Sequence, residues 1–414
     1  MRDITAASAG AFGKRISDRL AELAAISDEP GRLTRLYLGP GHRNAADLVS
    51  RWMREAGMAV RIDSTGNVVG RYRGQDPGPR TLMLGSHIDT VRDAGRFDGA
   101  LGVVTAIEVV AAASKAGKRY PFAIEVIAFG DEEGVRFPST LSGAKALAGR
   151  FDLKALDEIG EDGVSRRQAL LAFGCDPLRL SEEALSPEHA LGYVEVHIEQ
   201  GPVLEQEGLP VGVVTAIDGV TRGVVNVEGV AGHAGTVPMA MRKDALAAAA
   251  EMLIAVENRA RSRPNLVATV GKIDVPGASA NTIPGGARFT LDIRSPADQE
   301  RLSAVNDIRE LVAAIAQRRG VTAKFAVGHE VAAALCDARL SDELAATIEA
   351  MGLLPRRLPS GAGHDAMAFD KLIPFAMLFV RCRGGVSHNP AEFAAPDDID
   401  LATRVLAGFL DRIE

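Results

Sequence analysis

Three consecutive acidic residues end an apolar run in the segment Phe129-Gly-Asp-Glu-Glu-Gly-Val-Arg-Phe137. The common interpretation of such a triplet is a solvated acidic turn. The preceding run, 122–129, is typical of a buried strand, and ligands in α/β proteins gather beyond the carboxyl ends of strands. Because adjacent side chains point in different directions, Glu133 can bind a metal while Glu132 faces the bound water. This division suits a hydrolase, in which a metal lowers the pKa of water and a carboxylate takes its proton.

A histidine and two aspartates occupy a second polar stretch, Gly85-Ser-His-Ile-Asp-Thr-Val followed by Gly95-Arg-Phe-Asp-Gly-Ala-Leu-Gly102. His87 and Asp89 are two positions apart at an expected strand end, so both side chains can face one way. A metal-binding imidazole needs an acceptor for its other nitrogen, and Asp89 is placed to provide it. Asp98 precedes an expected helix, where a lone aspartate is ordinarily an N-cap.

Two further histidines lie near other expected strand ends. His197 belongs to the alternating segment Tyr193-Val-Glu-Val-His-Ile-Glu-Gln-Gly201, which on its own indicates a half-buried strand with a polar outer face. His388 lies in the loop Gly384-Gly-Val-Ser-His-Asn-Pro390. Taken together, nitrogen and oxygen ligands of this mixture suit two divalent ions such as zinc, manganese, cobalt or nickel. The candidate metal ligands are His87, Asp98, Glu133, His197 and His388.

Composition limits the classes of protein to which the chain can belong. Its 414 residues favour two domains, and a formal net charge of −7 argues against nucleic-acid binding. The three cysteines are far apart and match no metal-finger spacing, which fits a reducing compartment. The N-terminus lacks the pattern of a signal peptide, and no apolar run reaches the length of about 18 residues that a membrane span requires. We therefore expect a cytoplasmic protein without a membrane segment.

The expected elements divide into two patterns. The first alternates buried strands with helices, which indicates an α/β sheet, with strands over 81–84, 122–129, 193–198 and 376–380 and a helix over 102–116. The second has the order strand-helix-strand-strand-helix-strand of the ferredoxin-like plan, over 223–230, 244–261, 265–275, 287–294, 298–319 and 322–327. We expect a catalytic domain over 1–215 and 330–414 and an inserted domain over 216–329.

Several other catalytic motifs do not occur. The sequence has no HExxH, no GxSxG, no Walker A loop and no GxGxxG after a strand. These absences argue against a zincin, a serine hydrolase of the α/β type and a nucleotide-binding fold.

The motifs resemble those of the hydantoinase/carbamoylase group of binuclear amidohydrolases, which is related to aminoacylases and dimeric metallopeptidases. The resemblance runs from about Gly39 to about Ala407, and eight segments occur in the expected order: GSHIDTV, GRFDGALGV, DEEGVRF, VHIEQGPVLE, GHAGTVPM, NTIPGGARFTLDIR, SGAGHDA and GGVSHNP. It implies an α/β metallopeptidase-like catalytic domain with an inserted ferredoxin-like α+β domain, which acts as a lid and forms a homodimer.

The same resemblance implies a role for each polar residue near the predicted metal centre. Asp98 would bridge the two metals, His87 and His197 would complete one position, and Glu133 and His388 would serve mainly the other. Glu132 would act as general base and acid, and Asp89 would orient His87. No metal role is assigned to His364. The residues that would contact substrate or complete its pocket are Gln200, His233, Asn281, Arg294, Gly361 and Gly363.

Local chemistry agrees with the substrate roles, although each residue also has an ordinary interpretation. The guanidinium of Arg294 suits bidentate capture of a carboxylate, but a surface ion pair is its usual role. His233 would polarise a carbonyl as negative charge develops, and otherwise it is a polar loop residue. Asn281 precedes Thr-Ile-Pro-Gly-Gly and could serve turn chemistry alone. The glycines of Ser360-Gly-Ala-Gly-His-Asp365 could expose backbone N–H groups to an anion or simply form a flexible loop.

Together these features predict a hydrolase of the ureido C–N bond of a small carboxylate-bearing substrate. An N-carbamoyl-L-amino acid is the leading substrate, with amino acid, ammonia and carbon dioxide as products. The alternatives are an allantoate amidohydrolase, an aminoacylase or dipeptidase, and a non-catalytic binding protein of the same fold.

Overall fold

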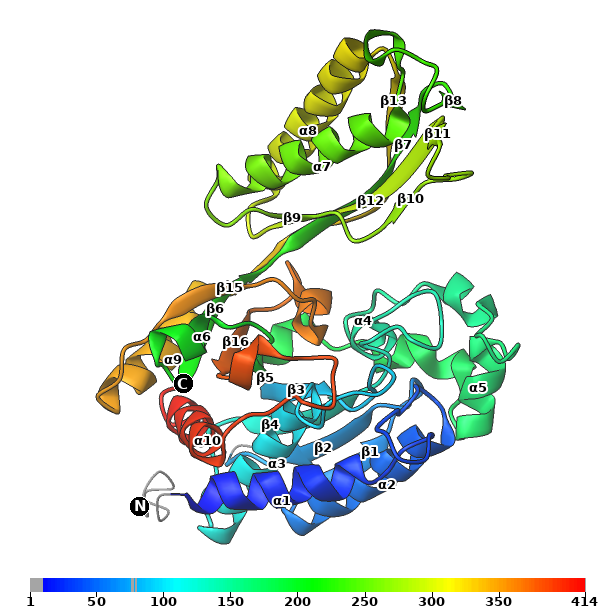
Figure 1. The fold of residues 1–414 in the computed structure, drawn as a ribbon. Helices are drawn as coiled ribbons and strands as arrows, with labels where there is room; N and C mark the ends of the chain where they lie inside the picture. The colour runs from blue at the N-terminus through cyan, green and yellow to red at the C-terminus, as the bar shows by residue number, and fades with distance from the viewer. Residues whose placement is uncertain (1–9, 76–77, 79, 414) are drawn as a thin grey trace. The chain divides into compact units, whose positions relative to one another are not determined.

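The computed structural model describes residues 10–75, 78 and 80–413 (Figure 1). The chain forms two compact units. Unit 1 comprises Met1–Thr215, Cys336–Leu358 and Ala362–Glu414, and unit 2 comprises Ala216–Leu335 with Pro359–Gly361. The predicted catalytic domain includes residues 1–9 and 414, which lie outside the described residues.

Unit 1 is built on a mixed sheet with the strand order β1-β2-β4-β3-β5-β16-β6, to which β15 is added beside β6. The short strand β14 continues this sheet, pairing with Ala216 and Ile217 at the end of β6, and these residues belong to unit 2. The four central strands β4, β3, β5 and β16 are parallel to one another, and the pairings toward both edges are antiparallel. The strands are β1 (Ala59–Ile62), β2 (Val68–Tyr72), β3 (Thr81–His87), β4 (Ala123–Phe129), β5 (Ala190–Ile198), β6 (Val211–Ile217), β14 (Ala334–Leu335), β15 (Arg357–Ser360) and β16 (Phe375–Val380).

The register of the central strands brings their carboxyl ends to one edge of the sheet. His87, the last residue of β3, lies beside Phe129, the last residue of β4. His197 on β5 lies beside Phe379 on β16. Near-continuous apolar runs explain why these strands are central, because parallel strands covered on both faces bury both sets of side chains.

Helices cover this sheet. Helix α3 (Ala100–Lys115) lies against β3 and β5, and it packs with α1 (Ala11–Ala24) and α10 (Pro396–Leu410). Because α3 is apolar around most of its circumference, it is buried within the unit. Helix α2 (Pro40–Glu55) packs on β1 and β2, and α9 (Ala338–Ala350) packs on β16. The shorter helices are α4 (Ser142–Leu147), α5 (Arg166–Phe173) and α6 (Val203–Glu207).

Unit 2 has the ferredoxin-like order that its sequence predicted. Its antiparallel sheet runs β10-β12-β7-β13, with β9 also beside β12. Helices α7 (Ala245–Arg261) and α8 (Asp298–Arg319) pack together and against this sheet, and they share a second hydrophobic core with it. The strands are β7 (Gly219–Glu228), β8 (Gly232–His233), β9 (Val267–Thr269), β10 (Ile273–Asp274), β11 (Thr282–Ile283), β12 (Gly286–Ser295) and β13 (Thr322–Val331).

One predicted strand of unit 2 is divided. The expected run over 265–275 is interrupted between β9 and β10. At the interruption the N–H of Lys272 donates to the side-chain Oγ1 of Thr290 at 3.1 Å, so a side chain replaces a backbone partner of the sheet. The alternation of apolar residues in the sequence does not show that a side chain has replaced the backbone acceptor at this point.

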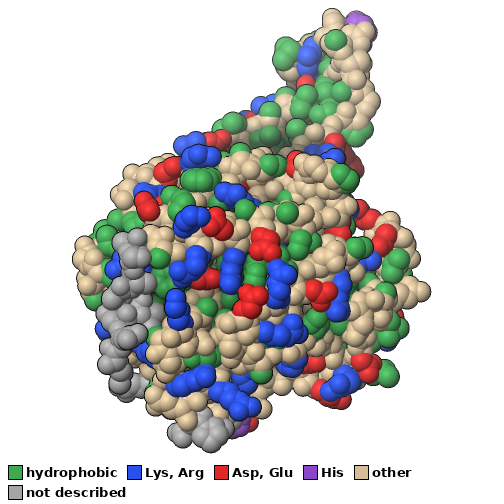
Figure 2. Space-filling view, turned by 90° about the horizontal axis from the view of Figure 1, so that it is seen from below, with side chains coloured by type: hydrophobic (Ala, Val, Ile, Leu, Met, Phe, Trp, Pro, Cys, Tyr) green, Lys and Arg blue, Asp and Glu red, His purple; other side chains and the backbone are tan. Residues whose placement is uncertain are grey.

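Charges on the surface are interspersed. Figure 2 shows lysine and arginine side chains next to aspartate and glutamate side chains on one face, with apolar side chains between them. Exposed pairs such as Arg51–Glu22 at 2.9 Å are common in unit 1, and each contributes little to stability. Among the described residues, no helix is long and apolar enough to cross a membrane.

Candidate metal centre

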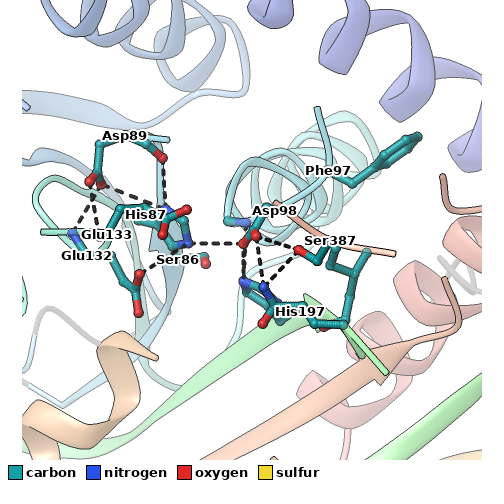
Figure 3. Close-up of polar contacts among 12 residues, drawn as sticks. Ser86, His87, Asp89, Phe97, Asp98, Glu132, Glu133, His197 and Ser387 are labelled. Carbon is teal, nitrogen blue, oxygen red and sulfur yellow. Dashed lines mark hydrogen bonds and ion pairs between the residues drawn. The ribbon is translucent and has the colours of Figure 1, made fainter. Parts of the chain in front are cut away.

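Asp98 lies at the centre of the polar cluster at the carboxyl edge of the sheet (Figure 3). Its Oδ1 is 3.1 Å from Nε2 of His197 and 3.5 Å from Nε2 of His87. Its Oδ2 is 3.4 Å from Nε2 of His388, which in turn lies 3.6 Å from Oε2 of Glu133. One carboxylate therefore faces three imidazoles, two through one oxygen and one through the other.

These side chains form two groups that share Asp98. In the first group Asp98 meets His87 and His197, and in the second it meets Glu133 and His388, with ligand atoms within 4.8 Å of one another in each group. Oε1 of Glu133 is buried and has no hydrogen-bond partner among the described residues. A buried carboxylate oxygen without a partner calls for an ion or a water, so the chemistry of the residues present fits a site for divalent cations.

Backbone carbonyls orient two of the histidines. Nδ1 of His87 lies 3.0 Å from the carbonyl oxygen of Asp89, and Nδ1 of His197 lies 2.9 Å from that of Ile198. Each ring therefore donates from Nδ1 and presents Nε2 to the cluster. The carboxylate of Asp89 accepts the N–H groups of Glu132 and Glu133, both at 3.2 Å, and its Oδ1 lies 3.7 Å from Nδ1 of His87. Asp89 thus contacts His87 through both its backbone and its side chain, and the acidic turn through its side chain.

Several turns of the centre have left-handed backbone. Asp131, Gln200 and His388 have φ values of 69°, 57° and 54°. Gly99 has φ 63°, and a Cβ there would lie 2.5 Å from ring atoms of His87. Gly99, rather than Asp98, is the N-cap residue of α3, and no side chain caps that helix. Strained conformations of this kind persist where the surroundings hold them, and they concentrate at functional sites.

Burial and charge shift the ionisation of the cluster. Burial favours a raised pKa for Asp98, but hydrogen bonds with the three histidines outweigh it and hold the pKa well below its usual range. Burial, with Asp98 nearby, raises the pKa of Glu133 to about 7. Burial also raises the pKa of Glu132 well above its usual value, and the attraction of His87 offsets only part of that rise. Because metal ligands must be deprotonated, metal binding at this centre should release protons.

Three residues that sequence reasoning missed or assigned differently hold Asp98. The Gln200 amide, expected in the substrate pocket, donates to Oδ2 of Asp98 at 2.8 Å and to Ser387 at 2.9 Å. The Ser387 hydroxyl is 2.8 Å from the same oxygen of Asp98 and 3.1 Å from Oε2 of Glu392. The other oxygen of Glu392 accepts the N–H groups of Phe97 and Asp98, at 2.7 and 3.1 Å. The only available signal was that Ser387 and Glu392 flank His388 in the sequence.

A buried glutamate, Glu195, lies close to the candidate metal ligand His197. Glu195 is fully buried and accepts hydrogen bonds from Ser86 at 2.7 Å and from Tyr193 at 3.2 Å. Its Oε2 also accepts the N–H that follows Asp365, at 3.3 Å. Glu195, His197 and His364 form a further group of closely spaced ligand atoms, although no metal role was predicted for His364. Burial lowers the pKa of His364 well below its usual value, so that ring stays neutral.

The candidate substrate residues of the inserted segment belong to unit 2, and the structure brings only some of them together. His233 on β8 lies beside β11, and the N–H of Ala234 donates to the carbonyl oxygen of Asn281 at 2.9 Å. Arg294 is near the carboxyl end of β12, whereas β11 precedes the amino end of that strand. Its Nε and Nη2 bind Asp292 at 2.7 and 3.0 Å.

The two glycines of the predicted pocket lie in different units. Gly361 belongs to unit 2, where its carbonyl oxygen accepts a hydrogen bond from Nη1 of Arg294 at 2.6 Å. Gly363 belongs to unit 1.

Comparison with known proteins assigns the family. The family described as peptidase family M20/M25/M40 matches residues 83–412. The chain is 41% identical to allantoate deiminase 1 of Glycine max, over 95% of this chain and 88% of that protein. It is 39% identical to an N-carbamoyl-L-amino acid amidohydrolase of Geobacillus stearothermophilus, over 95% and 97% of the two chains. A crystal structure of an amidase of the hydantoinase/carbamoylase family from Burkholderia multivorans matches with a TM-score of 0.91 and 33% identity, over 97% and 98% of the chains.

These matches confirm the resemblance that the eight motifs indicated, and they support a hydrolase of C–N amide bonds. They do not separate a carbamoyl amino acid from allantoate as the substrate, because relatives with both names are about equally similar. The chain belongs to the peptidase M20/M25/M40 family.

Proposed function

We propose that this protein is a two-metal amidohydrolase that cleaves the ureido C–N bond of a small carboxylate-bearing substrate. The observation that carries the proposal is the position of Asp98, whose two carboxylate oxygens face different groups of candidate ligands. In this assignment Asp98 would be a ligand of both divalent ions. His87 and His197 would complete one position, and Glu133 and His388 would complete the other.

Bound divalent metals lower the pKa of water and polarise a carbonyl oxygen. Glu132 acts as general base for that water and then as general acid toward the leaving nitrogen. Its Oε2 lies 3.9 Å from Nε2 of His87, its side chain is 12% exposed, and its ligand atom is grouped with those of His87 and Glu133. The peptide N–H groups of Glu132 and Glu133 are both held by Asp89, which keeps the base and the adjacent ligand in fixed directions.

The substrate roles are those that the family resemblance implies, and the chemistry of each side chain agrees with them. We assign to His233 the stabilisation of the developing oxyanion. We assign to Arg294 the capture of the substrate carboxylate, because its planar guanidinium is held in place by Asp292 and by the carbonyl oxygen of Gly361. Asn281 and the backbone around Gly361 and Gly363 contribute further polar contacts in this proposal. Gln200 donates a hydrogen bond to Asp98 within unit 1, and we assign it to the substrate pocket as well.

Water adds across the ureido carbonyl, and the products are an amine, ammonia and carbon dioxide. N-carbamoyl-L-amino acids are the leading substrates. Allantoate is the second candidate, favoured by the 41% identity to an allantoate deiminase. The test is ammonia release by the manganese-loaded protein with allantoate and a set of N-carbamoyl-L-amino acids, measured in parallel.

Each outcome of this panel has one meaning. Turnover of several carbamoyl amino acids supports a carbamoylase, and turnover of allantoate alone assigns an allantoate amidohydrolase. Absence of ammonia from every ureido substrate, with metal bound, refutes the ureido proposal and directs attention to N-acyl amino acids and dipeptides. Absence of any turnover together with absence of bound metal would fit a non-catalytic binding protein.

We also propose that unit 2 mediates formation of a homodimer. Strand β13 pairs with β7 on one side and, within the part of the chain that the structure describes, with no strand on its other side. An open strand edge is a ready site for pairing with a second chain. Light scattering on the eluting protein should give twice the chain mass of 43.6 kDa, and a monomer at micromolar concentration would contradict this assignment.

A further inference from the structure

A fully buried arginine lies behind the acidic turn of the metal centre. Arg166 is 0% exposed and is the first residue of α5. A cation at the amino end of a helix opposes the helix dipole, and taking its charge out of water costs further free energy. Side-chain capping of α5 is already supplied by Ser165 and Gln168. The position of Arg166 therefore calls for an explanation other than helix stability.

The guanidinium contacts both ends of one loop. Nη1 donates to Oδ2 of Asp131 and to the hydroxyl of Ser142. Nη2 donates to the carbonyl oxygen of Ser139 at 3.1 Å, to its hydroxyl at 2.9 Å and to Oε2 of Glu158 at 2.8 Å. The planar group also lies over the ring of Phe137, 4.5 Å from its centroid. Arg166 thus ties together the start, middle and end of the segment 131–142.

This segment carries the two acids of the centre. Asp131 immediately precedes Glu132 and Glu133, and its φ of 69° is a left-handed conformation that an aspartate adopts only at a cost. From the other side, Asp89 accepts the N–H groups of Glu132 and Glu133. The turn is therefore held between two anchors, Asp89 toward the sheet edge and Arg166 through the side chain of Asp131.

We propose that Arg166 is a positioning residue of this centre, whose guanidinium holds the Asp131–Glu133 turn so that Glu132 and Glu133 keep the directions that base and ligand require. The inference rests on the proposed function for its effect on turnover. It also predicts an effect on metal binding that does not depend on the substrate. Glu133 forms one ligand group with Asp98 and His388 and another with His87 and Glu132. In the proposed assignment it completes the position of His388, so loss of Arg166 should weaken that metal position more than the other.

The test compares the variants Arg166→Met and Arg166→Lys with the wild type. Zinc alone is titrated into the metal-free full chain in competition with a chromophoric chelator, which separates the first from the second equivalent.

For Arg166→Met we expect the second zinc to bind about 10- to 100-fold more weakly while the first is unchanged. On the best ureido substrate we expect kcat to fall about 100-fold with little change in KM, because misplacement of a catalytic group by about 1 Å has that effect. Arg166→Lys keeps the positive charge but lacks the planar, two-pronged guanidinium. It should therefore recover part of the zinc affinity and part of kcat.

Glu108→Gln is the matched control for loss of stability. Glu108 is 3% exposed and pairs with Arg15 at 2.8 Å and Arg19 at 3.2 Å, both on helix α1. This variant should lower the melting temperature while leaving kcat and both zinc affinities unchanged.

The inference is overturned if Arg166→Met lowers the melting temperature but leaves kcat and the second zinc affinity unchanged, or if both zinc equivalents weaken equally. If Arg166→Met does not fold, Asp131→Asn tests the same contact with the arginine in place, and it should give the same one-sided loss of zinc. If the wild type hydrolyses no ureido substrate, the proposed function fails. The zinc titration then still supports or overturns the role of Arg166.

Discussion

Replacing Glu132 with Gln removes one negative charge and keeps the shape of the side chain. Oε2 of Glu132 lies 3.9 Å from His87, while both ligand groups around Asp98 are complete without it. We therefore expect Glu132→Gln to bind two metals per chain and to lose turnover. A general base contributes about 10²- to 10⁴-fold. At about 1.4 kcal/mol for each factor of ten, the activation barrier should rise by about 3–5 kcal/mol.

The same variant should not destabilise the metal-free protein. The side chain of Glu132 is only 12% exposed, and an ionised carboxylate held away from water costs free energy that a neutral amide does not. Thermal unfolding of the metal-free forms at pH 8 should give a melting temperature for Glu132→Gln at or above that of the wild type. A large decrease would mean that the charge holds the turn together, contrary to the contacts of Asp89 and Arg166.

The assay combines metal analysis by mass spectrometry with ammonia release under saturating substrate. Glu133→Gln is the matched control. Glu133 belongs to the ligand group of His388, so this variant should lose bound metal as well as activity. Wild-type-like turnover by Glu132→Gln, or loss of metal from that variant, would refute the assignment of the general base.

Three further predictions concern stability, metal affinity and substrate binding. Burial, reinforced by nearby arginines, lowers the pKa of His42 to about 3, below an unfolded value of about 6.5. The unfolded chain therefore binds the extra proton first, and unfolding free energy should fall as pH drops from about 6.5 toward 3. Urea unfolding should show a weaker pH dependence in His42→Asn, which keeps an acceptor for the N–H of Leu38. Gly99→Ala adds a Cβ 2.5 Å from the ring of His87 at φ 63°, so calorimetry should show weaker zinc binding, and an unchanged affinity would contradict the geometry. Arg294→Lys loses the planar fork, and KM should rise about tenfold or more with little change in kcat, while an unchanged KM would remove Arg294 from the carboxylate site.

The architecture could be predicted because it follows from local patterns. Apolar runs marked three of the four central strands, the alternating segment 193–198 marked the fourth, and the order strand-helix-strand-strand-helix-strand marked unit 2. The strand that ends near His197 was described less well, since its alternating polar residues indicated a face open to solvent. Glu195 on that strand is instead fully buried, because Ser86 and Tyr193 from the same sheet supply its hydrogen bonds. A polar residue in a central strand can be satisfied by its neighbours, and one strand's sequence does not contain those neighbours.

The supporting residues of the centre could not be predicted for a related reason. Glu392 accepts the N–H of Phe97 from 295 positions away, and Arg166 reaches Asp131 from 35 positions away. Such pairs depend on how strands and loops are registered in space. An arginine at position 166 and a glutamate at position 392 each indicate that an ion pair or a hydrogen bond can form, but the sequence does not identify the partner. The ligands differ because each lies within or shortly after a recognisable strand end or, for Asp98, just before a helix, so its position along the chain already indicates the carboxyl edge of the sheet.

The contrast between the predictable ligands and the unpredictable supporting residues implies that the sheet and the turns contribute differently to the site. The parallel strands bring four chain segments to one edge, but the final direction of the functional side chains is set by left-handed residues at Gly99, Asp131, Gln200 and His388. At the three non-glycine residues these conformations cost free energy, and they persist because contacts from Asp89, Arg166, Ser387 and Glu392 hold the turns around them. Changes within the strands should therefore act mainly on stability. Changes at the turns and their anchors should act mainly on metal affinity and turnover, so measuring both quantities on each variant separates the two contributions.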